Sequence, residues 1–175
     1  MIISSDRFLM VIAPGNCYSC NGANSFIQLI LSPGFRIVSG KDEYPNEGNP
    51  EDEFMTLSWV TAINETALTR INDIAPLWKV AESKTLQQRV FMNHCIACGT
   101  HQGDFYLTKP DMPFWPMTED GAKAMRVVEI DCAIEVASLS PSSGLRFAIK
   151  QDGTCGLPDW PKHERKQPKK RIPKS

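Results

Sequence analysis

The sequence predicts a single α+β domain that is rich in β-structure and is followed by a short basic tail. Several short segments alternate apolar and polar residues with the period of a strand, whereas one segment has the spacing of a helix. With 175 residues, 42% of them apolar, the chain is long enough to bury a hydrophobic core. We expect one domain over residues 1–160 and a flexible tail over residues 161–175.

The N-terminal region predicts a hairpin of two apolar strands. Residues 7–13 form the first strand, and residues 25–32, which are rich in Ile, Leu and Phe, form the returning strand. Pro33 and Gly34 then predict a turn. A pair of cysteines lies between the two strands, and we therefore expect it at the tip of the hairpin.

Residues 33–84 predict an insertion that begins with a surface loop. Residues 41–53 include six acidic residues and almost nothing to bury, which is typical of a solvated loop. Residues 54–63 then alternate apolar and polar side chains, and we interpret them as one strand with one buried face.

Helical spacing follows directly after this strand. Asn64 is a suitable cap for a helix that begins at Glu65, because its side chain can accept a backbone hydrogen bond. Apolar residues then recur every three or four positions as far as Pro76, which cannot continue a helix because it lacks an N–H. Residues 77–80 predict a short second helix.

The C-terminal half predicts three further strands. Residues 85–93 form a strand that leads into the second cysteine pair. Residues 128–136 and 145–149 each alternate apolar and charged side chains. We expect these two segments to pair as an antiparallel hairpin, which would place Glu135 opposite Arg146 on a solvated face.

Three features of this half lie outside the regular patterns. Phe114 and Trp115 stand among three prolines, so we expect an aromatic loop that either packs on the core or forms a contact surface. Cys132 lies on the apolar face of its predicted strand and is interpreted as a small core residue. Cys155 lies in a loop beside glycines, and the sequence assigns it no role.

The four remaining cysteines form two pairs with identical spacing: Cys17, Cys20, Cys95 and Cys98. A C-x-x-C turn places two thiolates about one tetrahedron edge apart, and two such turns complete the four-sulfur shell that structural zinc prefers. The turn after the second ligand favours residues that tolerate positive φ, and Asn21 and Gly99 hold these positions. The sequence therefore predicts a structural zinc site.

The separation of the two pairs departs from a compact zinc ribbon. Between Cys20 and Cys95 lie 74 residues, against roughly 15–20 in a compact ribbon. We therefore expect a zinc-ribbon-like domain with a long strand-helix insertion, over about residues 33–84, between the two knuckles. A metal ion that joins such distant segments would contribute on the order of 10 kcal/mol.

Other interpretations of this region stay open. A redox C-x-x-C would need only one pair. His94 or His101 could replace a thiolate, although we expect His94 to orient the knuckle and His101 to lie at the surface. Just beyond the second pair, Gly103 would allow close packing, and Gln102 or Asp104 would accept backbone hydrogen bonds beside the metal.

The net charge of −1 conceals two oppositely charged parts. Residues 162–175 hold seven basic residues and one acidic residue, which leaves residues 1–161 with a net charge of −7. Such a tail can neutralise phosphates without reading sequence, and its basic residues are Lys162, Arg165, Lys166, Lys169, Lys170, Arg171 and Lys174. The apolar residues 8–13 are too few for a signal peptide or a membrane span. We therefore expect a cytoplasmic protein without membrane contact.

Residues 93–107 read NHCIACGTHQGDFYL. Together with the first cysteine pair, they resemble an uncharacterised family of bacterial proteins that carry a C-x-x-C near the N-terminus and N-x-C-x-x-C-G-x-x-Q-G-[DN] downstream. The resemblance covers the two pairs and residues 83–107, and it implies zinc binding and a long insertion but no reaction. Where the family often has a tryptophan in the first knuckle, this chain has Tyr18 and Ser19.

These observations favour a non-catalytic binding module that zinc stabilises, with an unknown protein or nucleic acid as its partner. Four thiolates leave no open position for water, so the metal would be structural. The first alternative is nucleic-acid binding through the basic tail. The second is a hydrolase-type enzyme that uses His101 and Asp104 near the zinc, although the chain has no Ser/His/Asp set, phosphate loop or H-E-x-x-H helix.

Overall fold

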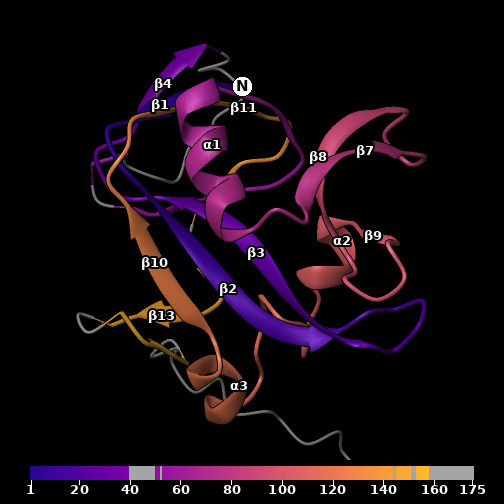
Figure 1. Cartoon of the computed structure of the whole chain (residues 1–175). Coiled ribbons are helices and arrows are strands. Elements are labelled where there is room, and N and C mark those ends of the chain that lie inside the picture. Colours follow the sequence, from indigo (N-terminus) through magenta and orange to yellow (C-terminus); the bar gives the residue numbers. More distant parts are fainter. Residues whose placement is uncertain (40–49, 52, 144, 151–152, 158–175) are drawn as a thin grey trace, which may run out of the picture.

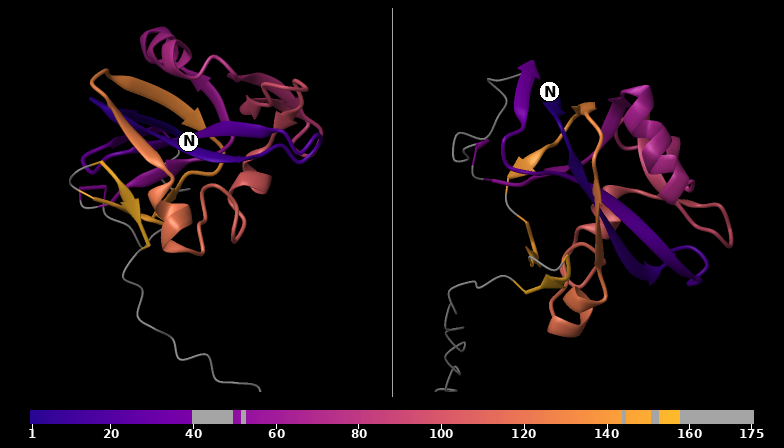
Figure 2. Two further views of the ribbon diagram at one scale, coloured as in Figure 1. Left: turned by 60° about the horizontal axis from the view of Figure 1, so that its bottom comes forward. Right: turned by 60° about the vertical axis from the view of Figure 1, so that its left-hand side comes forward.

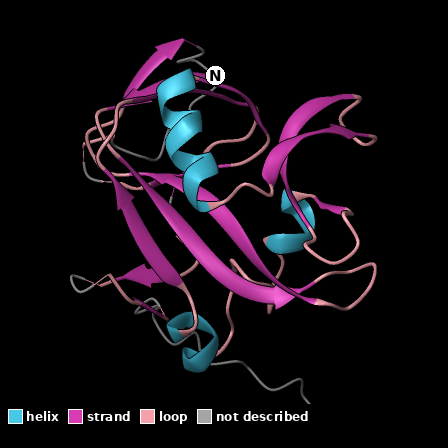
Figure 3. Cartoon of the chain, in the orientation of Figure 1, coloured by secondary structure: helices cyan, strands magenta, loops and turns pink. Residues whose placement is uncertain are grey.

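The computed structural model of the chain describes residues 1–39, 50–51, 53–143, 145–150 and 153–157. Fourteen strands and three short helices run through these residues, so the predicted β-rich α+β class is confirmed (Figure 3). The basic tail and most of the acidic loop predicted over residues 41–53 lie outside the described residues. None of the helices in the described part of the chain is long and apolar enough to cross a membrane.

The centre of the molecule is a long antiparallel hairpin of β2 (Phe8–Asn16) and β3 (Ala23–Leu31) (Figure 1). These strands match the two that the sequence predicts. They lie in a five-stranded sheet of order β10-β2-β3-β5-β12. β10 (Arg126–Ile130) pairs with β2, while β5 (Met55–Leu57) and β12 (Ser142–Ser143) extend the sheet beyond β3.

Both faces of the central hairpin are buried over most of its length, which explains why its strands are mainly apolar. Phe8 and Met10 belong to one core cluster, whereas Leu9 and Val11 belong to a second cluster. Because successive side chains of a strand point to opposite faces, one strand supplies both cores. The first cluster also contains residues of α1 (Glu65–Ile74), and α1 and the α3 region lie on opposite sides of the hairpin (Figure 2).

A second sheet, of order β4-β1-β11-β6, lies beside α1. Its strands are β4 (Arg36–Ser39), β1 (Ile2–Ser5), β11 (Ile134–Ser138) and β6 (Val60–Ile63). All of its pairings are antiparallel.

The third sheet carries the second cysteine pair. It consists of β7 (Trp78–Ser83), β8 (Gln88–His94) and β9 (His101–Gln102), in that order. α2 (Asp104–Leu107) follows β9 directly. The strand that the sequence predicts over residues 85–93 is thus present as β8.

The C-terminal part closes the second core cluster. α3 (Glu119–Lys123) contributes Ala122 to this cluster, and the short ribbon of β13 (Ala148–Ile149) and β14 (Cys155–Gly156) contributes Cys155. Phe114, from the aromatic loop, is buried in the same cluster, so this part of the loop packs on the core.

The strand predicted over residues 54–63 is two strands. β5 and β6 belong to different sheets, and the chain bends between them at Trp59, whose φ is 53°. Such a conformation is unusual for a bulky residue. Asp104 holds it in place, because its Oδ2 accepts a hydrogen bond of 2.6 Å from the Trp59 N–H. Alternation alone could not reveal this bend, since its stabilising partner lies 45 residues away.

The predicted cap and second helix need partial correction. α1 begins at Glu65 and ends before Pro76 as predicted, and Asn64 occupies the cap position. The Asn64 side chain, however, makes no bond to the helix and instead accepts the Glu135 N–H at 2.9 Å. Residues 77–80 do not form a helix, because strand pairing of β7 with β8 prevails over local preference.

The prediction that residues 128–136 and 145–149 pair as a hairpin is wrong. The first segment is not one strand: β10 ends at Ile130, and β11, which begins at Ile134, lies in a different sheet. Arg146 therefore does not face Glu135, and its guanidinium instead lies 4.4 Å from the centre of the Trp115 ring. Cys132 lies between β10 and β11, is only partly buried and packs against the first core cluster.

Candidate metal centre

The four paired cysteines meet at one end of the central hairpin. Cys17 and Cys20 lie in the loop between β2 and β3, and Cys95 and Cys98 lie in the loop between β8 and β9. All four Sγ atoms lie within 4.8 Å of one another. The Cys17–Cys98 and Cys20–Cys95 sulfur pairs are each 3.7 Å apart, whereas a tetrahedron with Zn–S bonds of about 2.3 Å has edges of about 3.8 Å. The cluster therefore fits a tetrahedral ion.

The two loops repeat the same backbone turn. The N–H of Asn21 donates to the carbonyl of Cys17 at 2.8 Å, and the N–H of Gly99 donates to the carbonyl of Cys95 at 2.9 Å. Asn21 has a φ of 57° and Gly99 a φ of 73°. The prediction that these residues adopt positive φ is confirmed.

Backbone groups also point at the sulfurs of the two buried ligands. The N–H of Ser19 lies 3.4 Å from Cys17 Sγ, and the N–H of Ala97 lies 3.4 Å from Cys95 Sγ. N–H groups stabilise the thiolate form of cysteine, which is the form that binds a metal. The backbone thus favours the thiolate form of one cysteine in each loop, Cys17 in the first and Cys95 in the second.

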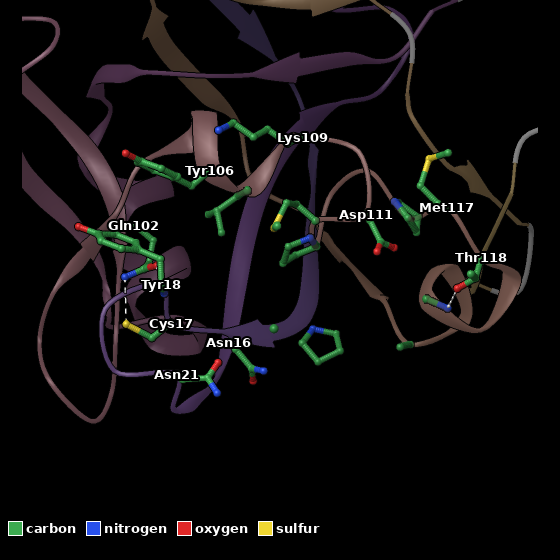
Figure 4. A pocket seen from close by; sticks show the side chains of 18 residues that line it. Asn16, Cys17, Tyr18, Asn21, Gln102, Tyr106, Lys109, Asp111, Met117 and Thr118 are labelled. Atoms are coloured by element: carbon green, nitrogen blue, oxygen red, sulfur yellow. Dashed lines mark hydrogen bonds between the residues drawn. The ribbon is translucent and has the colours of Figure 1, made fainter.

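Gln102 joins the two loops through three hydrogen bonds. Its Nε2 donates to Cys17 Sγ at 3.3 Å (Figure 4). The same Nε2 donates to the carbonyl of Thr100 at 3.2 Å, and the Oε1 accepts the Tyr18 N–H at 3.2 Å. The side chain is only 1% exposed. As predicted, Gln102 accepts a backbone hydrogen bond, and it does so beside the cysteine cluster. The close packing predicted at Gly103 is not found, because an added Cβ there would meet nothing within 4 Å.

Asn93 aligns β8 with β3. Its side-chain amide accepts the N–H of Ile27 at 2.8 Å and donates to the carbonyl of Ile27 at 3.0 Å. β3 pairs with β5 only from Leu29 onward, so Asn93 bonds to a part of the β3 edge that no other described strand covers. The strand pattern of the sequence does not indicate that Asn93 bonds to Ile27, because the two residues lie 66 positions apart.

Neither histidine near the second pair is placed as a ligand. His94 Nδ1 lies 3.0 Å from the carbonyl oxygen of Met92 and 3.2 Å from that of Leu77, so the ring is fixed to the backbone. Burial lowers the pKa of His94 and favours the neutral ring. Among the described residues, only the four cysteines form a cluster that could hold a metal.

The thiols differ in their electrostatic surroundings. The Thr100 hydroxyl and N–H lower the pKa of Cys98 to about 6. The N–H of Gly22 lowers the pKa of Cys20, but the nearby Cys98 and Cys95 raise it to about 12. Four thiolates at this distance repel one another, so without a cation some of the thiols keep their protons. A bound cation would offset the repulsion and keep all four thiols deprotonated.

A groove of about 530 Å³ opens directly beside Cys17 (Figure 4). Tyr18, from inside the first cysteine pair, stacks on Tyr106 from α2 with ring centroids 5.1 Å apart. The Lys109 ammonium lies 5.1 Å from the centre of the Tyr106 ring.

The far wall of the groove approaches β2 closely at Gly15. A Cβ at this position would lie 2.7 Å from Pro113 Cγ, so only glycine accepts this contact without a shift. The loop around Pro113 is thereby held against β2, which ends at Asn16, the residue before Cys17. The same strand, β2, thus leads into the first cysteine pair and forms part of the groove wall.

Comparison with known proteins gives no match. No protein-family model matches the chain, and searches of curated proteins and of solved structures also find none. Fold and site define a β-rich protein with a four-cysteine cluster that could bind a metal ion. The resemblance to the bacterial family stays a prediction.

Proposed function

We propose that this chain is a binding module that a structural zinc ion stabilises, and that it recognises a protein segment through the groove beside Cys17. The observation that carries the proposal is the set of large apolar side chains left exposed around this groove. They are Tyr18, Tyr106, Met112 and Met117, and the exposed Phe105 ring contacts Tyr106 from outside the groove. Exposed apolar clusters of this kind mark contact sites, and methionine adapts well to varied partners.

The charge of the chain favours a protein partner. Residues 1–161 carry a net charge of −7, which opposes the approach of a phosphate backbone. The groove is lined by aromatic rings, methionines and one charge of each sign, Lys109 and Asp111, which suits an apolar segment. The negative net charge of residues 1–161 favours a segment that is neutral or basic.

Zinc supports this surface directly. Tyr18 lies between Cys17 and Cys20, so the metal that fixes these ligands also fixes one of the two stacked rings. A shell of four thiolates has no open position for water or substrate, and the role that we propose for the ion is therefore structural and non-catalytic.

Metal content and binding test the two halves of this proposal separately. Mass spectrometry of the purified protein should find one zinc per chain, and iron or no metal would contradict the zinc assignment. A displayed peptide library selected on the zinc-loaded protein should yield peptides whose affinity falls at least tenfold with Tyr106→Ala. Val38→Ala, at an exposed apolar residue of β4, is the matched control. Selected peptides that bind both variants equally would contradict the groove as the recognition surface.

Nucleic-acid binding through the tail is a second proposal that rests on sequence alone. Seven basic residues among residues 162–175 give a segment of opposite charge to the rest of the chain. Affinity for DNA or RNA should fall with added salt and with deletion of residues 162–175. Affinity that neither change alters would contradict this role.

A further inference from the structure

A second cavity, of about 230 Å³, lies over the edge of the five-stranded sheet, away from the cysteines. Its floor is polar because of the strand register. Thr56 pairs with Ile30 of β3 and with Ser142 of β12, so Thr56 and Ser142 share a face with Gln28, which is two residues from Ile30. On the same face of β3, Phe26 and Ile30 are fully buried core residues, and the half-buried Asn24 lies near the start of the strand. Gln28, Thr56 and Ser142 thus form a polar patch beside the buried Phe26 and Ile30.

These floor residues are largely buried, and their side chains line the cavity. Gln28 is 8% exposed and Thr56 is 9% exposed. Within the part of the chain that the structure describes, neither side chain makes a hydrogen bond. Polar side chains that line a cavity can form their hydrogen bonds with water or with a ligand there.

A carboxylate lies at the inner end of the cavity. Asp104 lines both this cavity and a small void that continues toward the core at Trp78 and Phe91. Its Oδ2 accepts the Trp59 N–H, whereas its Oδ1 has no hydrogen-bond partner among the described residues. The positive φ of Trp59 places backbone strain at the same point, and such strain is often found at functional sites.

A guanidinium lies at the mouth. Arg146 is exposed, and its guanidinium lies over the Trp115 ring, which also lines the cavity. Phe114 and Phe147, each 2% exposed, supply apolar walls between the two ends. The cavity therefore has a negative inner end, an apolar middle with hydroxyl and amide groups, and a positive mouth.

We propose that this cavity binds a small zwitterion of amino-acid size, with its ammonium group at Asp104 and Gln28 and its carboxylate at Arg146. The volume has room for roughly eight water-sized groups, which is smaller than a site for a nucleotide or a drug-sized ligand. Burial raises the pKa of Asp104 to about 6, so the carboxylate is ionised at neutral pH while it lacks a cationic partner. An ammonium group would supply that partner.

Calorimetric titration of the full-length, zinc-loaded protein tests the proposal. The probes are the twenty standard L-amino acids, β-alanine and 4-aminobutyrate. We expect at least one to bind, and its N-acetylated and amidated analogues, which lack one charge each, to bind at least tenfold more weakly. Absence of binding by every zwitterion in the set would overturn the proposal.

Two variants test the two ends of the cavity. Asp104→Asn keeps an acceptor for the Trp59 N–H and should weaken binding at least tenfold, as should Arg146→Gln at the exposed mouth. Arg70→Gln, on the exposed side of α1, is the matched control and should bind as the wild type does. If Asp104→Asn misfolds, as judged by circular dichroism, Arg146→Gln decides. Binding that Arg146→Gln leaves unchanged would overturn the proposal.

Discussion

The cysteine centre and the cavity over β3 differ in how their polar groups are satisfied. At the centre, Gln102 and the turn N–H groups bond to sulfur and to one another across two loops. In the cavity, Gln28 and Asp104 Oδ1 have no partner within the described residues. The first region is assembled by its own contacts and needs only an ion, whereas the second is open to a ligand. Stability should therefore depend on the first region and respond to pH at the second.

Removal of one ligand should have the largest effect. Cys17→Ala leaves three thiolates, and we expect it to abolish stoichiometric zinc and to lose most of a contribution on the order of 10 kcal/mol. Urea unfolding followed by circular dichroism, with metal analysis of the same samples, measures both quantities. Cys132→Ala, at a partly buried cysteine away from the cluster, should keep its zinc and lose about 1 kcal/mol or less. Equal losses in the two variants would contradict a metal centre at Cys17.

Removal of the Asn93 amide should have the next largest effect. Asn93→Ala leaves the N–H and carbonyl of Ile27 unpaired beside the centre, which should cost about 2–4 kcal/mol in the free energy of unfolding. Asn24→Ala removes a single bond of 3.4 Å to the His94 carbonyl and should cost about 1 kcal/mol or less. Both values come from urea unfolding at saturating zinc. A cost for Asn93→Ala no greater than that for Asn24→Ala would show that the amide does not align the two hairpins.

The buried carboxylate should reverse the usual pH response of an acidic residue. Burial raises the pKa of Asp104 to about 6, which lies above its value in the unfolded chain. The stability that the protonated form contributes is therefore complete below about pH 4 and is lost as pH rises through about 6. The stability of the wild type relative to Asp104→Asn should fall by about 2 kcal/mol between about pH 4.5 and about pH 7.5.

The comparison with Asp104→Asn cancels the pH dependence of zinc binding, since both proteins keep all four cysteines. Asp120→Asn, at an exposed residue of α3, serves as the control and should show no such change. A constant difference between the wild type and Asp104→Asn across this range would mean that the carboxylate is solvated.

The smallest of these effects concerns metal affinity without loss of a ligand. Gln102→Leu removes the donor to Cys17 Sγ, and we expect roughly tenfold weaker zinc binding, since groups that orient metal ligands typically contribute this much. Competition with a chromogenic chelator measures the affinity. His101→Leu is the control: within the described residues His101 makes no hydrogen bond to any of the four cysteines, so this change should leave the zinc affinity as it is in the wild type. If Gln102→Leu bound zinc as tightly as the wild type does, the hydrogen bond from Gln102 to Cys17 Sγ would have no role in metal binding.

Sequence alone was sufficient where the signal is local. The spacing of the cysteines, the positive φ at Asn21 and Gly99, and the apolar strands of the central hairpin all depend on neighbouring residues. The cap position at Asn64 and the end of α1 before Pro76 follow from local chemistry in the same way.

Long-range contacts account for what the sequence did not reveal. The alternating residues 54–63 and 128–136 look like single strands, but each segment passes from one sheet to another, and period-two patterning does not encode that change. The bend at Trp59 depends on Asp104, and the position of β8 depends on Asn93 and Ile27. The cavity likewise becomes visible only when the register brings Gln28, Thr56 and Ser142 onto one face.

The distance between the cysteine pairs along the chain also has a consequence during synthesis. The 74 residues between Cys20 and Cys95 take roughly 4–15 s to translate at about 5–20 residues per second. During this interval the emerged hairpin offers only two thiolates, which is half of a tetrahedral shell. A complete four-sulfur shell, and the stability that a bound ion would contribute, are therefore available only after the loop that follows β8, with Cys95 and Cys98, has left the ribosome.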